Sequence, residues 1–136
     1  MSESKEITIK SELQSISQVE KLIDGLCQVY NIDEEHYGNI LIALTEAVNN
    51  AIVHGNRLDI DKNVTLSYIA SEKSLKFIVS DEGPGFDYDN LPDPTAPENI
   101  EKPHGRGVFL MKNLADQCSF LDDGRIVELE FEAVMA

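Results

Sequence analysis

Three short stretches of the sequence place polar or glycine residues at spacings suited to chemistry. The first is LTEAVNNAIVHGN, in which Glu46 and Asn50 lie four residues apart and therefore share one flank of a helix. A carboxylate on that flank can accept a proton, and oxygen ligands of this kind can hold Mg²⁺. The same spacing also suits a solvated helix surface, and periodicity does not choose between the two interpretations.

The other two stretches combine glycines with the end of a strand or the start of a helix. In VSDEGPGF, Asp81 ends an apolar run, and Gly83 and Gly85 allow a sharp turn and the close approach of a ligand. In HGRGVFLM, Gly105 and Gly107 begin a helical pattern, where free backbone N–H groups and the helix dipole can bind phosphate. Taken singly, each stretch is equally compatible with an ordinary turn or helix start.

Hydrophobic periodicity predicts the elements that position these residues. The predicted order is strand, two helices, two strands, a long loop, a helix and two strands. The predicted strands cover residues 5–10, 64–70, 75–80, 118–121 and 126–134, the predicted helices cover 13–29, 34–53 and 106–117, and the loop covers 81–105. We expect the first strand to lie at a sheet edge, the two middle strands to form an antiparallel hairpin, and Asp123-Gly124 to form a type I′ turn. Ser11 or Ser15 is the expected N-cap of the first helix, and Asp33 that of the second.

This order predicts an α+β fold, a two-layer α/β sandwich with helices on one face of a mixed, largely antiparallel sheet. In the second helix, Leu44, Val48 and Ile52 fall opposite Glu46, so the polar flank is expected to face away from the core. We expect a single domain over residues 1–136, because a chain of 136 residues suffices for one ordinary core and is too short for two.

The predicted loop over residues 81–105 holds all five prolines of the chain and shows little periodicity. Irregular segments of this length are uncommon in small domains unless they serve a function. We therefore expect the residues from about Phe86 to His104 to form a lid that orders over a bound ligand.

Composition excludes several classes of function. Eleven basic and 25 acidic residues give a net charge of −14, which opposes binding to nucleic-acid phosphates. Cys27 and Cys118 have neither the number nor the spacing of a disulfide scaffold or a metal site. No window is apolar for long enough to span a bilayer, and the N-terminus lacks a secretory pattern. We expect a cytoplasmic protein that binds neither nucleic acid nor membrane.

The three stretches together resemble the motifs of the GHKL ATPase superfamily, which includes histidine kinases, gyrase-type ATPases and anti-sigma-factor serine kinases. The N box of that superfamily matches Glu46-x-x-x-Asn50, its G1 box matches Asp81-x-Gly83-x-Gly85, and its G2 box matches Gly105-x-Gly107. Three motifs in this order are far more specific than any one of them. The resemblance covers nearly the whole chain and implies the Bergerat-type ATP-binding fold.

The resemblance also implies a Mg-ATP site. By it, Asp81 would accept a hydrogen bond from the adenine amino group, Asn50 would hold Mg²⁺ between the phosphates, and Glu46 would act as a base. The glycines would line the nucleotide, and His54 would help to close the N box. Arg106, inside the G2 box, would stabilise charge on the transferring phosphate, with a solvent-facing position as its alternative.

Within the superfamily, the chain is most similar in length and in the run EAVNNAIVHGN to the small anti-sigma-factor and stress-response serine-protein kinases. A histidine kinase would need a separate helix pair that bears a phosphoacceptor histidine, and a strand at the very start leaves no place for one. We therefore expect His36, His54 and His104 to have structural roles and not to accept phosphate.

The leading hypothesis is a Mg-ATP-dependent kinase that phosphorylates serine or threonine on an antagonist protein and binds a sigma factor in its other state. These protein partners follow from the resemblance, and a homodimer is an assembly compatible with it. The main alternative is a non-catalytic, ATP-gated protein-binding module, which would not need a base at Glu46. A solvated helical surface without a ligand is the third hypothesis, and it predicts that nucleotide changes nothing.

Overall fold

The structure is a computed structural model that describes residues 2–71, 73–83 and 106–132. Five strands form one sheet in the order β1-β2-β3-β5-β4, with β1 at an edge as expected. The strands are β1 Ser2–Lys10, β2 Asn63–Ser71, β3 Ser74–Ser80, β4 Gln117–Leu121 and β5 Ile126–Phe131. The helices are α1 Ile16–Tyr30, α2 Glu34–Asn50 and α3 Arg106–Leu114.

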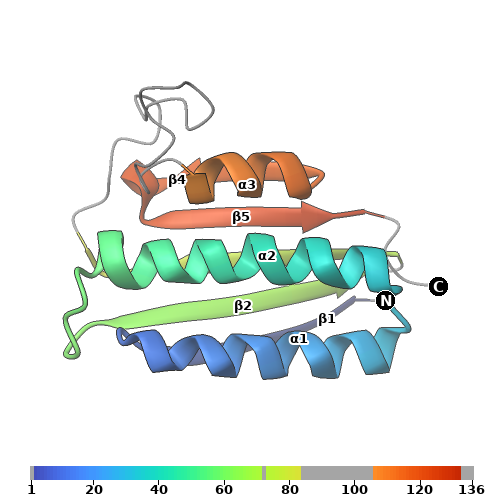
Figure 1. The fold of residues 1–136 in the computed structure, drawn as a ribbon, viewed down its shortest axis with the longest axis horizontal. Coiled ribbons are helices and arrows are strands. Elements are labelled where there is room, and N and C mark those ends of the chain that lie inside the picture. The colour runs from blue at the N-terminus through green and yellow to red at the C-terminus, as the bar shows by residue number, and fades with distance from the viewer. Residues whose placement is uncertain (1, 72, 84–105, 133–136) are drawn as a thin grey trace.

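All neighbouring strands of this sheet pair antiparallel. The prediction of a two-layer α+β fold is confirmed, but the expected mixture of parallel and antiparallel pairs does not occur among the described strands. β4 does run parallel to β3, yet β5 lies between them and pairs with both. Figure 1 shows the helices lying along one side of the sheet, and α2 packs against both α1 and α3.

The core lies between the sheet and the helices. Alternate residues of β2 are buried, whereas their neighbours on the opposite face are only half-buried. In α2, Leu44 and Val48 are fully buried, and so is Ile52 in the turn that follows, which confirms the predicted core flank. Glu46 and Asn50 lie on the other flank of α2 and are half-buried. The chain therefore leaves one polar flank of its central helix beside α3 and outside the core.

Of the two predicted helix caps, the cap of α2 is confirmed and the cap of α1 is wrong. Asp33 caps α2 as expected, because its Oδ1 accepts a hydrogen bond from His36 N at 2.8 Å. The prediction that Ser11 or Ser15 caps the first helix is wrong. Ser11 Oγ donates to Lys62 O at 2.6 Å, and Ser15 precedes α1 without a side-chain cap bond. A 3₁₀ turn, η1 Leu13–Ser15, leads into α1 instead.

The predicted ends of two helices also differ. The second helix is α-helical to Asn50 and then continues as one π-helical turn, η2 Ala51–Gly55, which ends at the expected exit. The third helix ends at Leu114, before residue 117, because β4 begins there and pairs with β5.

The predicted type I′ turn is wrong as well, because that turn needs positive φ at both central residues. A 3₁₀ turn, η5 Asp122–Gly124, joins β4 and β5, with positive φ at Asp122 and Gly124. Over the described ranges, all helices fall short of the length and apolar content that a membrane span requires.

Candidate functional site

Glu46 and Asn50 lie where α2 meets the start of α3. A Cβ atom at Gly107 would be 2.8 Å from Glu46 Oε2 and 3.2 Å from Asn50 Nδ2. Because Gly107 has no side chain, α3 can begin directly against both groups. The structure thus brings together the carboxylate and the amide of the N box and one glycine of the G2 box.

Asp81 lies directly after β3 and is half-buried. Its backbone N donates to Arg125 O at 2.9 Å, and its Oδ1 accepts a hydrogen bond from Gly83 N at 2.9 Å. A Cβ atom at Gly55 would overlap the Asp81 carboxylate, and one at Gly83 would overlap the Gly55 carbonyl. Both positions therefore require glycine, and the end of η2 rests directly on the Asp81 turn.

The environment of Asp81 disfavours its charge. Burial raises the pKa of the Asp81 carboxyl, and this effect exceeds the opposing effects of the Gly83 N–H and of the Arg125 and Lys62 cations. A ligand that donates a hydrogen bond to the carboxylate would therefore stabilise a group whose ionised form is costly in the free protein.

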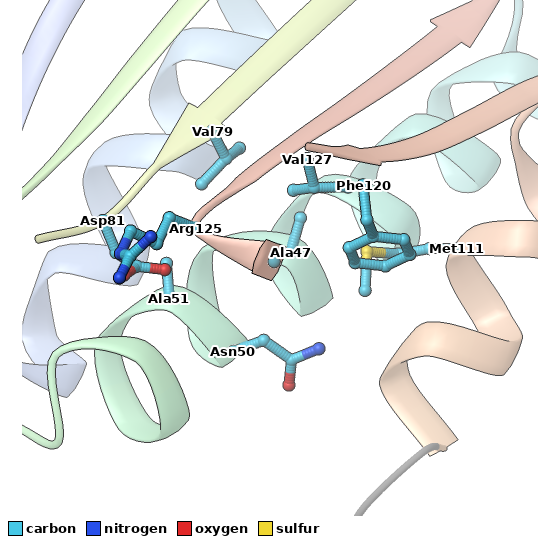
Figure 2. Close-up of a pocket in the computed structure, with 10 residues that line it drawn as sticks. Ala47, Asn50, Ala51, Val79, Asp81, Met111, Phe120, Arg125 and Val127 are labelled. Atoms are coloured by element: carbon cyan, nitrogen blue, oxygen red, sulfur yellow. The ribbon is translucent and has the colours of Figure 1, made fainter. Parts of the chain in front are cut away.

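One pocket connects Asp81 to Asn50, and Figure 2 shows both residues at its wall. The pocket encloses about 270 Å³ between atoms, part of it open to solvent. Its walls are mostly apolar and come from α2, η2, β3, α3, β4 and β5, through Ala47, Ala51, Val79, Met111, Phe120 and Val127. Apolar walls with a few polar groups at fixed places are typical of small-molecule sites. A heterocycle with an N–H donor would suit the end that holds Asp81.

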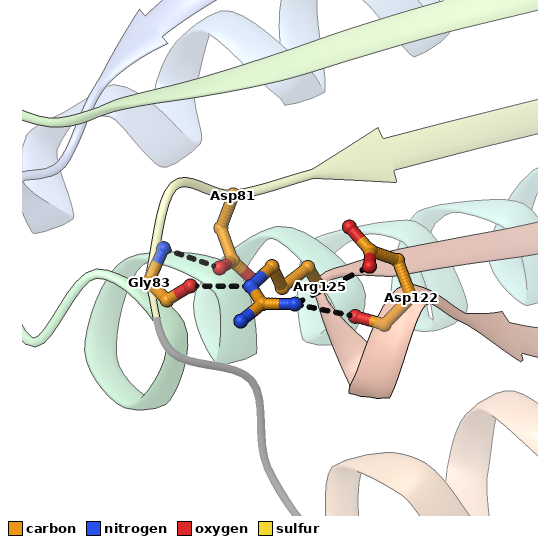
Figure 3. Close-up of polar contacts among 4 residues, drawn as sticks. All are labelled: Asp81, Gly83, Asp122 and Arg125. Carbon is orange, nitrogen blue, oxygen red and sulfur yellow. Dashed lines mark hydrogen bonds and ion pairs between the residues drawn. The ribbon is translucent and has the colours of Figure 1, made fainter.

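Two residues of this region were not predicted from the sequence. Arg125 lines the pocket, and its Nε donates to Gly83 O at 2.8 Å, as Figure 3 shows. Asn56 is buried, and its Oδ1 accepts a hydrogen bond from Glu82 N at 2.7 Å. Arg125 belongs to no motif, and the sole sequence signal for Asn56 is that it ends the polar stretch that begins before Glu46.

The remaining predicted site residues are only partly described. Gly85 and Gly105 lie outside the described residues, as does the expected lid from Phe86 to His104. Arg106 is the first residue of α3. His54 is half-buried within η2, the turn that connects Asn50 to the glycine packed on Asp81.

The side chains that could be metal ligands also limit how the predicted Mg²⁺ ion could bind. Within the part of the chain that the structure describes, no group of three or more His, Cys, Asp or Glu side chains could hold a metal ion. Mg²⁺ commonly binds through one or two protein oxygens together with substrate phosphates and water. Asn50, next to the space left open by Gly107, fits that mode of binding, whereas a cage made entirely of protein ligands does not fit the described residues.

Comparisons with known proteins agree with this fold. The curated serine-protein kinases RsbW of Bacillus cereus and Bacillus anthracis are each 24% identical over 124 residues, which cover 87% of this chain and 77% of theirs. The crystal structure of the RsbU and RsbW domains of a Mycobacterium tuberculosis protein has the same fold, with a TM-score of 0.69 at 16% identity. That match covers 96% of this chain but only 32% of the other.

A family model gives the broadest assignment. The model of the histidine kinase-like ATPase domain matches residues 9–131, which include Glu46, Asn50, Asp81 and Gly107. The match extends from the edge strand β1 to the last residue of β5. The chain therefore belongs to the histidine kinase-like ATPase family.

Proposed function

We propose that the chain is a Mg-ATP-dependent serine/threonine-protein kinase that phosphorylates an antagonist protein in a sigma factor pathway. The observation that carries this proposal is a continuous series of groups. The pocket links Asp81 to Asn50, and Gly107 links Asn50 to Glu46. A nucleotide can lie along this series with its base at one end and its phosphates at the other.

At the base end, the adenine amino group would donate a hydrogen bond to the Asp81 carboxylate. The apolar walls, including Ala47 and Met111, would pack on the ring and exclude water. A hydrogen bond between a buried charged acceptor and a well-placed donor is worth about 1.5–3 kcal/mol. The base end would thus supply both affinity and selectivity.

At the phosphate end, Gly107 lies in the first turn of α3, where backbone N–H groups favour anions. Mg²⁺, when bound, would neutralise phosphate charge, and Asn50 would be its protein ligand. The Glu46 carboxylate would accept the proton of the attacking hydroxyl. The hydroxyl oxygen would then bond to the γ-phosphorus while the bond to ADP breaks. Arg106, at the start of α3, would stabilise the charge of the transferring group.

The protein partners in this proposal are supported by similarity. The curated relatives are named serine-protein kinases, and the structural neighbour contains an RsbW domain. By that similarity the acceptor is a serine or threonine of an antagonist protein, and a sigma factor is the second partner. A homodimer, a single domain over residues 1–136 and a cytoplasmic location, where ATP is available, belong to the same proposal.

Incubation of the full chain with labelled ATP, Mg²⁺ and candidate antagonist proteins tests the proposal. We expect label on a serine or threonine of one antagonist. Calorimetric titration should show ATP binding that Asp81→Asn weakens by roughly tenfold or more, since the amide places a donor against the adenine amino group. Binding without transfer to any antagonist would favour the ATP-gated binding module, and a chain that does not bind ATP would contradict the proposal.

A further inference from the structure

Side chains hold the backbone of two consecutive residues, Glu82 and Gly83, in the turn that follows β3. Gly83 N donates to Asp81 Oδ1 at 2.9 Å, Glu82 N donates to Asn56 Oδ1 at 2.7 Å, and Gly83 O accepts from Arg125 Nε at 2.8 Å. These contacts tie the turn to the residue after η2 on one side and to the residue before β5 on the other. The backbone that carries the Asp81 carboxylate is therefore fixed from two directions.

The orientation of the Asn56 carboxamide follows from its surroundings. Asn56 is only 1% exposed, and its Nδ2 donates to Ser11 Oγ at 2.8 Å and to Asn63 O at 3.0 Å. Ser11 Oγ donates its own proton to Lys62 O at 2.6 Å, so toward Asn56 it can only accept. The nitrogen of the carboxamide must then face Ser11 and Asn63, which leaves the oxygen for Glu82 N.

This network determines the direction of the Asp81 carboxylate. One carboxylate oxygen is engaged by Gly83 N, and a Cβ atom at Gly55 would overlap the other. The carboxylate is thus enclosed between Gly55 and Gly83, and its plane depends on where the turn places Gly83 N. Asn56 contacts the peptide group immediately before that one. Without this contact, Glu82 N would be unpaired and the turn could relax, which would change the direction of the carboxylate.

We propose that Asn56 is a positioning residue that holds the Asp81 carboxylate in the direction needed to accept a hydrogen bond from an exocyclic amino group. The inference rests on the proposed binding of adenine nucleotide and deepens it. Asn56 would set how strongly the pocket prefers a base with that amino group over one without it. Asn56 itself would not contact the nucleotide.

The decisive measurement compares ATP with purine riboside triphosphate, which lacks the amino group. Any general damage to the fold should weaken both ligands alike, whereas a misdirected carboxylate should weaken ATP alone. We expect the wild type to prefer ATP by roughly ten- to a hundredfold, the size expected for one hydrogen bond to a charged group. Asn56→Ala should reduce this preference by about three- to tenfold, with little change in affinity for the analogue.

Matched variants separate positioning from stability. Ser11→Ala removes one of the two partners of Asn56 Nδ2 but leaves the contact with Glu82 N, so it should lower the melting temperature and keep the preference. Asn56→Asp keeps an oxygen for Glu82 N and loses the donor to Asn63 O, so it should also keep the preference within about twofold. If Asn56→Ala does not fold, Asn56→Ser, whose hydroxyl is one bond too short for Glu82 N, replaces it.

Each outcome decides a stated point. An unchanged preference in Asn56→Ala overturns the positioning role and leaves the proposed function intact. An equal fall in Ser11→Ala also overturns it, because the contact with Glu82 would then not be the cause. A wild type that binds both triphosphates equally overturns the inference, since Asp81 would not recognise the amino group. A wild type that binds neither overturns the proposed function as well.

Discussion

The two ends of the candidate site are built in different ways. At the base end, the backbone and carboxylate of the Asp81 turn are hydrogen-bonded to Asn56, Arg125 and the turn itself. At the phosphate end, the side chains of Glu46 and Asn50 lie beside Gly107. Neither side chain makes a hydrogen bond to any other residue in the ranges 2–71, 73–83 and 106–132.

If nucleotide binds as proposed, this difference corresponds to two strategies of recognition. A base is rigid and has few hydrogen-bonding groups, so a carboxylate fixed in advance can recognise it without losing freedom on binding. A triphosphate with Mg²⁺ brings its own charges and can supply the partners that the side chains at the other end lack within the described residues. Substitutions at the base end should therefore change which base is preferred, whereas those at the phosphate end should change phosphoryl transfer or the affinity for the Mg-triphosphate.

The largest expected effect is at Glu46. Glu46→Gln keeps the size of the side chain and removes the base, so phosphoryl transfer to the antagonist should fall by roughly 10²–10⁴-fold. ATP affinity should stay nearly constant, because the proposed base acts only on the hydroxyl. Single-turnover transfer and calorimetric titration measure the two quantities, with the exposed Glu35→Gln on the same helix as the control. Unchanged transfer would remove Glu46 from the mechanism.

A substitution at Gly107 tests whether the space beside the side chains of Glu46 and Asn50 is needed for phosphate binding. In Gly107→Ala, the new methyl group would meet the ends of Glu46 and Asn50, which can move aside while the fold persists. Displacing both groups should weaken ATP by roughly tenfold or more and leave adenosine unaffected.

Gly38→Ala in α2 is the matched control for Gly107→Ala, because a Cβ atom there would have no neighbour within 4 Å. It should stabilise the helix by about 0.5–1 kcal/mol and leave both ligands unchanged. Equal losses of affinity for ATP and adenosine in Gly107→Ala would show that Gly107 does not belong to the phosphate end alone.

The parts of the fold that were predicted correctly are those set by local patterns. The Asp33 cap depends on an N–H three residues away, and the hairpin of β2 and β3 depends on alternation and a short turn. The prediction for Ser11 failed because a distant contact decided it. Ser11 Oγ donates a hydrogen bond to the backbone carbonyl of Lys62, which lies 51 residues further along the chain. No local pattern contains that information. Ser15 Oγ has no hydrogen-bond partner among the described residues, and the turn before β5 closes locally, through a hydrogen bond from Arg125 N to Asp122 O.

The candidate site divides in the same way. Glu46, Asn50 and Asp81 stood out because they belong to short motifs with a fixed spacing. Arg125 reaches Gly83 across 42 residues, and Asn56 reaches Glu82 across 26, so neither contact leaves a signature in adjacent sequence. The antiparallel pairing of β3 with β5 is what brings Arg125 beside Asp81. Residues that support a functional group thus emerge only once the strands are paired.

A smaller effect is expected at Asn50. Asn50→Ala deletes one oxygen ligand of a hard cation but leaves the phosphates and water in place. We expect ATP affinity in the presence of Mg²⁺ to fall several-fold, and affinity measured in EDTA to change little. Titrations with and without Mg²⁺ give the comparison, and Asn49→Ala on the same helix is the control. An equal loss in EDTA would assign Asn50 to the base end, since it also lines the pocket.

The smallest expected effect is on the stability of the folded protein, which the buried Asp81 carboxylate lowers. Because burial raises the pKa of Asp81 in the folded protein, its charge is disfavoured there relative to the unfolded chain. Its contribution to stability is then fully present below the unfolded value of about 4 and is lost as pH rises through the raised folded value. Asp81→Asn removes that loss and keeps an oxygen for Gly83 N. Without nucleotide, the variant should therefore melt up to a few degrees above the wild type at pH 7 and lose this advantage near pH 4.

Melting curves from pH 4 to 8, with and without ATP, test this expectation. ATP should reverse the order of the two proteins, since the Asp81 carboxylate accepts from the amino group whereas the Asn variant presents a donor there, and ligand binding raises the stability of the form that binds it. A wild type that is the more stable protein at every pH without nucleotide would mean that Arg125 and Lys62 outweigh burial at Asp81. The base end would then be fixed without a cost in stability, and the contrast with the phosphate end would concern hydrogen bonds alone.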